Sequence, residues 1–281
     1  MDQAFDTEVT VKTLQRPARS ALQFYEARSD GKAHKRPIVF IHGAFCGGWI
    51  WGRYFQPFFA HHGFDSYAID LRGRRSVSPF IPTPHGLSDY AADVEDLIEH
   101  LGIPPILIGH SLGGLVAQKV SAVQHPHALA LLASVPPEGM TFASWQLALS
   151  NPLLFWNTAT FAMSPSMGSV SVAREALFSP DAPDAVARDI LRRSSPEAPR
   201  ALMEAQLPLA CAPGYLNGIP LTVVGGSEDR LIPASAVERT AQFHGVTPVI
   251  FEDTAHALMV DTRWQTVAQH VLDWIDAEVA P

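Results

Sequence analysis

A serine at position 111 stands in a five-residue pattern that can support acyl chemistry. Residues 109–113 read GHSLG, between the apolar residues 105–108 and the helical pattern of residues 115–124. A serine on a sharp strand-to-helix turn needs glycine neighbours, because Cβ atoms would crowd its strained backbone. The following helix directs N–H groups and its positive end toward the serine. Such a match arises by chance in about one chain in ten of this length. The flanking strand and helix therefore carry the prediction that Ser111 is a nucleophile.

A serine nucleophile needs a base, and the base needs a carboxylate to orient it. Of the 12 histidines, His256 is the best candidate, because it follows the strand-like residues 248–251 and precedes the last helical pattern. Asp229 follows the strand-like residues 221–224 and a glycine turn, and we prefer it to its neighbour Glu228. Ligand-facing groups of parallel sheets lie beyond the carboxyl ends of the strands. The order Ser, Asp, His is that expected for a strand–turn–helix nucleophile. The alternative for Asp229 is that it merely caps the next helix.

A second glycine turn offers donors for a developing oxyanion. Residues 42–49 read HGAFCGGW and follow an apolar run at residues 37–41. We assign the oxyanion hole to the backbone N–H groups of Ala44 and Leu112. Losing one such donor typically costs about 3–4 kcal/mol in the transition state, so this turn matters as much as any side chain.

The elements that must position these groups follow a strand–helix rhythm. Apolar runs suited to strands buried on both faces occupy residues 37–41, 66–69, 105–108, 128–132, 221–224 and 248–251. Amphipathic patterns at residues 90–101 and 264–275 predict helices, and residues 9–27 predict two antiparallel strands. This alternation predicts an α/β fold with a mostly parallel central sheet flanked by helices.

The alternation of predicted strands and helices stops in the middle of the chain. Residues 136–216 are rich in Pro, Ala, Leu and Met and contain no β-branched runs, and residues 183–193 look helical. We interpret residues 136–216 as a helical cap insertion in one core domain made of residues 1–135 and 217–281.

Composition narrows the class of partner. The formal net charge is −8 and 17% of residues are charged, which argues against a nucleic-acid-binding surface. Cys46 and Cys211 cannot make a disulfide framework. The opening sequence lacks a signal-peptide pattern, and no apolar stretch approaches about 18 residues. We therefore expect a cytoplasmic protein without a membrane span, whose partner is a small molecule and whose oligomeric state is open.

Five motifs together resemble a known family. HGAFCGGWIW, DLRGRRS, GHSLGG, GGSEDRLIP and DTAHALMVD are similar, in this order, to the motif series of α/β-hydrolase fold proteins. The first and third look most like the small-carboxylesterase branch that includes plant methyl esterases and hydroxynitrile lyases. The resemblance implies that Ala44 supplies an oxyanion N–H and that no metal or organic cofactor is needed. It also implies that the insertion is a cap lining the substrate pocket. Candidate substrate-binding residues are Phe45, Trp145 and Trp156, with Phe155 and Phe161 as further cap aromatics.

The motif series has departures that bear on function. Arg75 stands where the family commonly has glycine, either as a solvated arginine or as a cationic rim for an acidic substrate. Cys46, next to the oxyanion turn, is a small buried filler or a reactive thiol. Hydroxynitrile lyases carry Lys and Thr at the positions of Ala257 and Gly43, which disfavours cyanohydrin cleavage.

Three function classes follow from these observations. The first is a serine hydrolase that cleaves an ester of a small or medium apolar substrate through an acyl-enzyme. The second is a carbon–carbon bond hydrolase or lyase that uses the same three residues. The third is a non-catalytic ligand-binding member of the fold.

Overall fold

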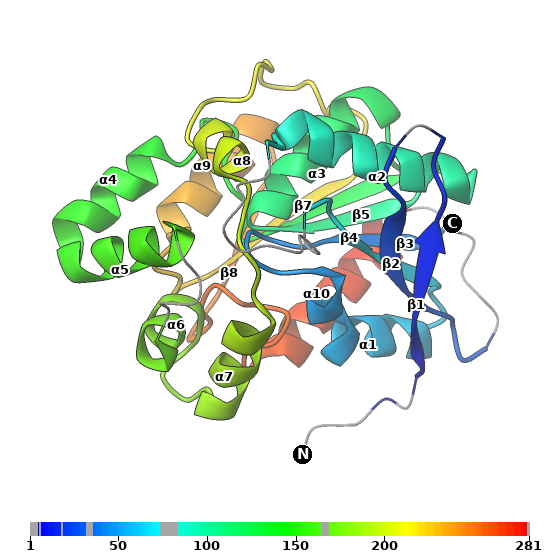
Figure 1. The fold of residues 1–281 in the computed structure, drawn as a ribbon. Coiled ribbons are helices and arrows are strands. Elements are labelled where there is room, and N and C mark those ends of the chain that lie inside the picture. The colour runs from blue at the N-terminus through cyan, green and yellow to red at the C-terminus, as the bar shows by residue number, and fades with distance from the viewer. Residues whose placement is uncertain are drawn as a thin grey trace.

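A single eight-stranded sheet runs through the molecule in the order β1-β2-β4-β3-β5-β6-β7-β8 (Figure 1). The computed structural model describes residues 5, 7–17, 19–31, 36–73, 84–163 and 169–279. The strands are β1 (Val9–Leu14), β2 (Leu22–Ala27), β3 (Ile38–Ile41), β4 (Ser66–Asp70), β5 (Ile106–His110), β6 (Ala128–Leu132), β7 (Leu221–Gly226) and β8 (Pro248–Phe251). β1 pairs antiparallel with β2, and β2 pairs antiparallel with β4, whereas the remaining neighbours are parallel. The predicted mostly parallel sheet is confirmed.

Helices cover both faces of this sheet because its inner strands are apolar on both faces. In β3, Ile38 and Phe40 pack into one core and Val39 and Ile41 into the other, and all four are fully buried. The first core is covered by η1 (Gly48–Arg53), α1 (Phe55–His61) and α10 (Trp264–Glu278). The second is covered by α2 (Leu87–Leu101), α3 (Leu112–Gln124) and α9 (Ala234–His244) (Figure 1).

A helical insert joins β6 to β7. Its helices are α4 (Thr141–Ser150), α5 (Pro152–Met163), α6 (Val170–Leu177), α7 (Asp184–Arg193) and α8 (Pro199–Glu204). α4 and α5 lie side by side at the edge of the molecule, whereas α6 and α7 lie nearer to the carboxyl ends of the strands (Figure 1). The predicted helical insertion is confirmed, and its exact boundaries at residues 136 and 216 stay a prediction. Within the described part of the chain, no helix is long and apolar enough to cross a bilayer.

Candidate active site

Ser111 occupies a strained turn between β5 and α3. Its backbone angles are φ 53° and ψ −121°, in a region that residues other than glycine rarely adopt. Such strain persists only where the surroundings hold it. The Ser111 N–H donates to the Leu132 carbonyl oxygen at 3.1 Å, and the Val135 N–H donates to the Ser111 carbonyl oxygen at 3.0 Å. The end of β6 and the residues after it thus hold both backbone groups of the serine.

The glycines around the serine allow the start of α3 to lie against β3. A Cβ atom on Gly113 would collide with the carbonyl oxygens of Ile41 and His42 at the end of β3. A Cβ atom on Gly109 would lie 2.6 Å from the Gly113 carbonyl oxygen. This close approach brings the first N–H groups of α3 next to the glycine turn that follows β3.

His256 and Asp229 form a buried pair at the same edge of the sheet. Asp229 lies three residues after β7 and His256 lies five residues after β8. His256 Nδ1–H donates to Asp229 Oδ2 at 2.8 Å, and both side chains are buried. Asp229 Oδ1 accepts from the N–H groups of Leu231 and Ile232, each at 2.8 Å. The same carboxylate therefore orders the loop before α9 and orients the imidazole, so the two readings of Asp229 are compatible.

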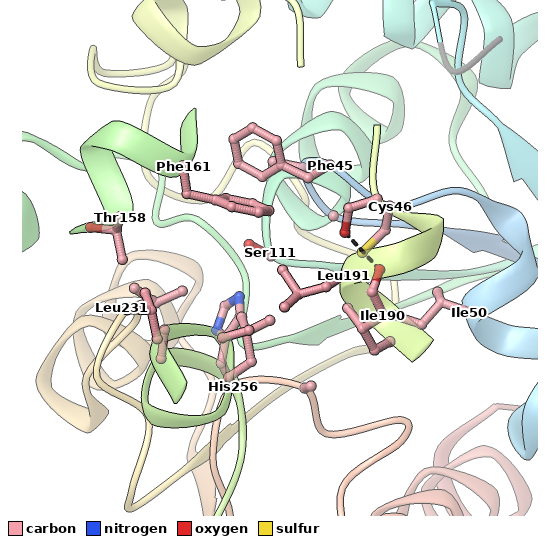
Figure 2. Close-up of a pocket in the computed structure, with 18 of the residues that line it drawn as sticks. Phe45, Cys46, Ile50, Ser111, Thr158, Phe161, Ile190, Leu191, Leu231 and His256 are labelled. Carbon is pink, nitrogen blue, oxygen red and sulfur yellow. Dashed lines mark hydrogen bonds between the residues drawn. The ribbon is translucent and has the colours of Figure 1, made fainter. Parts of the chain in front are cut away.

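A cavity of about 150 Å³ joins these groups. Ser111 and His256 both line it, and Figure 2 shows the His256 ring directed toward Ser111. Its walls are largely apolar and come from the turn after β3, from α5, α6 and α7, and from the loop after Asp229. The remaining lining residues are Gly43, Ala44, Phe45, Cys46, Ile50, His110, Thr158, Phe161, Ser169, Val172, Ala173, Ala176, Leu177, Ile190, Leu191, Ser194, Leu231 and Ala257.

Of the three residues expected to bind substrate, only Phe45 lines this cavity. Its ring lies 5.0 Å from that of Phe161 on α5, in an edge-on arrangement. Trp145 and Trp156 are 66% and 69% exposed and are not among the lining residues, so this cavity does not support the prediction for these two. The reason is helical geometry. Positions 158 and 161 share one face of α5, whereas position 156 lies on the opposite side.

Several further lining residues were not predicted from the sequence. Leu231 could have been found, because it follows the proposed carboxylate by two residues. Val172, Ile190 and Leu191 lie on insert helices, and their direction depends on how those helices pack on the core.

The turn after β3 presents unused backbone donors. Among the described residues, the N–H groups of Ala44 and Leu112 have no hydrogen-bond partner. The peptide unit that carries the Ala44 N–H is fixed through its carbonyl, because His42 Nδ1–H donates to the Gly43 oxygen at 2.8 Å. The Leu71 N–H donates to His42 Nε2 at 3.2 Å, which defines a single neutral tautomer of this histidine. Two free N–H groups beside Ser111 can stabilise a developing oxyanion.

A second histidine, His110, is hydrogen-bonded to the backbone of His256. The pKa of His110 lies well below its usual value, mainly because the ring is buried and to a lesser extent because His256 is close. The ring therefore stays neutral. His110 Nε2–H donates to the His256 carbonyl oxygen at 2.9 Å, and the two rings are 4.7 Å apart. A neutral His110 does not compete with His256 for a proton.

Cys46 and Arg75 were noted above as departures from the family's motifs, and the structure describes only the first of them. Cys46 is half-buried and lines the cavity, and its thiol role stays a prediction. Arg75 lies outside the described residues. In the part of the chain that the structure describes, no group of three His, Cys, Asp or Glu side chains is arranged to hold a metal ion.

Comparison with known proteins gives the family. Residues 38–270 match the Alpha/beta hydrolase family. A (Lyso)-N-acylphosphatidylethanolamine lipase from Mus musculus is 33% identical over 107 residues, which is 37% of this chain and 31% of that protein. Salicylic acid-binding protein 2 from Nicotiana tabacum is 32% identical over 120 residues, 41% of this chain and 45% of that protein. The aligned regions thus span less than half of each of these two relatives.

The fold is shared with solved structures at low identity. An esterase from Exiguobacterium antarcticum superposes with a TM-score of 0.71 at 16% identity, covering 91% of this chain and 96% of that chain. At this identity the likeness concerns the fold alone.

Proposed function

The chain belongs to the Alpha/beta hydrolase family, and from that membership we propose that it is a serine hydrolase that cleaves carboxylic esters. The observation that carries the proposal is that His256, paired with Asp229 at 2.8 Å, lines one apolar cavity together with Ser111. The proposed catalytic residues are Ser111 as nucleophile, His256 as base and Asp229 as the carboxylate that orients His256.

In the proposed reaction, Ser111 Oγ attacks the ester carbonyl carbon while His256 Nε2 takes the hydroxyl proton. The tetrahedral intermediate collapses to the acyl-enzyme, and the leaving alkoxide takes that proton and departs as an alcohol. Water then gives a proton to His256 and attacks the acyl carbon. The second collapse releases the carboxylic acid and returns the proton to Ser111 Oγ. Asp229 keeps a hydrogen on Nδ1, so that Nε2 faces the serine as the base.

The N–H groups of Ala44 and Leu112 stabilise the oxyanion in this scheme. Two features support the assignment: both donors are unused among the described residues, and one belongs to the first turn of α3. Donors that are already oriented need no rearrangement as charge develops, which is why they stabilise the transition state more than the substrate.

The lining of the cavity points to an uncharged, apolar substrate. None of the described lining residues is Lys, Arg, Asp or Glu, and burying an unpaired charge there would cost several kcal/mol. An engineered apolar cavity of roughly 150 Å³ in another protein binds benzene. We therefore propose that the cavity holds a group of about six carbons, and that residues 136–216 act as the cap that covers it.

The test is covalent labelling combined with an ester series. A fluorophosphonate probe should label folded wild-type protein at Ser111, and labelling should be lost in Ser111→Ala and His256→Ala. Ser194→Ala is the matched control, because Ser194 also lines the cavity but lies outside the proposed catalytic set. With p-nitrophenyl esters from acetate to decanoate, kcat/KM should peak near about six carbons.

Other outcomes would select the alternative functions. If folded wild-type protein is not labelled and turns over none of the esters, a ligand-binding role replaces the enzyme proposal. If vinylogous diketones are cleaved while esters are not, the same three residues perform carbon–carbon bond hydrolysis.

A further inference from the structure

A buried carboxylate from the insert contacts the turn that carries the proposed oxyanion donor. Glu197 lies between α7 and α8 and is only 6% exposed. The Phe45 N–H donates to Glu197 Oε2 at 3.1 Å. Glu197 Oε1 accepts from the Tyr90 hydroxyl on α2 at 2.5 Å and from the Ala198 N–H at 2.9 Å. One side chain thus joins the insert, the core helix α2 and the turn after β3.

The residue held by this carboxylate has a strained backbone. Phe45 has a φ of 64°, in the left-handed region that favours glycine. Such a conformation persists where several contacts define it together. Besides the Phe45 N–H, its carbonyl oxygen is also held, because the Ser195 N–H donates to it at 3.0 Å. Both backbone groups of Phe45 are therefore bound by residues 195–197 of the insert.

The contact with Glu197 restricts the adjacent oxyanion donor. Two planar peptide units meet at the Cα atom of Ala44. The first unit carries the Ala44 N–H and is held by His42 through the Gly43 oxygen. The second unit carries the Phe45 N–H and is held by Glu197. With both planes held, the Ala44 N–H has one direction, whereas losing either contact lets the turn rotate about Ala44.

The same segment contacts the turn again further along. The Arg193 guanidinium lies 4.1 Å from the centre of the Trp49 ring, at the start of η1. The insert and the oxyanion turn are therefore in contact at both ends of residues 45–49, so the geometry of the turn depends on the insert being in place.

We propose that Glu197 is a positioning residue that fixes the Ala44 N–H of the oxyanion hole by holding the Phe45 peptide. This inference rests on the proposed ester hydrolysis. The insert then has a second role besides covering the substrate, because it holds the turn that carries the Ala44 N–H in its conformation. Glu197 does not line the cavity, so it acts through Phe45 and not by contact with substrate.

The variants separate positioning from simple anchoring of the insert. Glu197→Ala leaves the Phe45 N–H without its acceptor. Glu197→Asp keeps the charge but withdraws it by one methylene group. Tyr90→Phe removes a donor to the other carboxylate oxygen and leaves the Phe45 contact intact, so it is the matched control for anchoring.

The measurement is the hydrolysis of p-nitrophenyl acetate together with inhibition by a trifluoromethyl ketone, which forms an oxyanion on Ser111. For Glu197→Ala and Glu197→Asp, kcat should fall about 10- to 100-fold with little change in KM, because a donor misplaced by about 1 Å loses this much. The inhibition constant should rise by the same factor. Tyr90→Phe should stay within about threefold of wild type, because the hydrogen bond from the Phe45 N–H to Glu197 survives in this variant.

Two results would overturn the inference. One is folded Glu197→Ala or Glu197→Asp protein with wild-type kcat and wild-type inhibition. The other is a Tyr90→Phe variant that loses as much activity as Glu197→Ala, which would reduce Glu197 to an anchor of the insert. If Glu197→Ala does not fold, Glu197→Asp alone decides. The outcome is distinct from a failure of the proposed function, in which wild-type protein itself would show neither ester turnover nor labelling.

Discussion

Replacing Asp229 by Asn exchanges one carboxylate oxygen for an NH₂ group, and it should prevent His256 from acting as the base. Asp229 Oδ1 accepts two backbone N–H groups, from Leu231 and Ile232, and Oδ2 accepts from His256 Nδ1–H, all three at 2.8 Å. An asparagine in this place must direct its carbonyl oxygen to the two N–H donors. Its NH₂ group then faces Nδ1, which must present a lone pair. The ring proton moves to Nε2, where the serine proton would have to go.

The magnitude follows from that change of tautomer. In another triad enzyme, the Asp→Asn change leaves the geometry intact and lowers kcat by about 10⁴. At about 1.36 kcal/mol for each factor of ten, this loss corresponds to about 5.4 kcal/mol of transition-state stabilisation. The hydrogen-bond pattern of the loop is retained, so we expect the melting temperature to change far less than the activity does.

The assay is kcat/KM for p-nitrophenyl acetate, with the fluorophosphonate labelling rate as a second readout. Glu228→Gln is the control, because Glu228 is the neighbouring carboxylate on the same turn and its side chain is exposed. A folded Asp229→Asn protein that keeps more than about a tenth of wild-type activity would refute the tautomer argument. A large loss in Glu228→Gln with none in Asp229→Asn would show that the carboxylate was assigned to the wrong residue.

Three further predictions concern stability and specificity. Gly113→Ala should lower the free energy of unfolding by about 3 kcal/mol, since its Cβ meets the backbone carbonyls of Ile41 and His42; an unchanged urea midpoint would contradict this. Burial lowers the pKa of His244 from 6.5 to about 4, so the unfolded chain binds the proton first as the pH falls. The stabilising contribution is therefore complete above pH 6.5 and is lost toward pH 4. It amounts to about 2 kcal/mol after solvent screening. Urea unfolding at pH 7 and 4.5 should show a smaller acid loss in His244→Gln, and equal losses would contradict the assignment. Ala173→Phe should fill much of the cavity of about 150 Å³. It should lower kcat/KM for hexanoate at least about tenfold more than for acetate, and a parallel loss for both esters would argue against this cavity as the acyl site.

The sheet could be predicted from the sequence because its signal is local. Most inner strands are apolar runs with a glycine at their end or a few residues later, and both properties are visible within ten residues. The predicted run at residues 128–132 matches β6, although it is poor in β-branched residues. The alternation of strands and helices along the chain predicts this strand, whereas its β-strand propensity alone does not.

The residues proposed for catalysis could be named for the same reason. Parallel strands end at one edge, so the residues after β5, β7 and β8 meet there whatever the side-chain details. Asp229 and His256 therefore lie together, at 2.8 Å, although 27 residues separate them in the chain.

The walls of the cavity could not be predicted, because they depend on how the insert helices pack. Trp145 and Trp156 were chosen for their type, yet the faces that carry them point to solvent. Glu197 had no signal at all: a glutamate in a proline-rich segment looks solvated, and only its contacts with Phe45 and Tyr90 show otherwise.

The exposure of those two tryptophans has an optical consequence. Trp145 and Trp156 lie in water on α4 and α5, whereas Trp51 and Trp264 are fully enclosed in the core. A soluble quencher such as acrylamide will reach the first pair in the folded protein and the second only on unfolding. The intrinsic fluorescence of the chain thus contains separate reporters for the insert and for the core, and rearrangement of one can be followed while the other stays native.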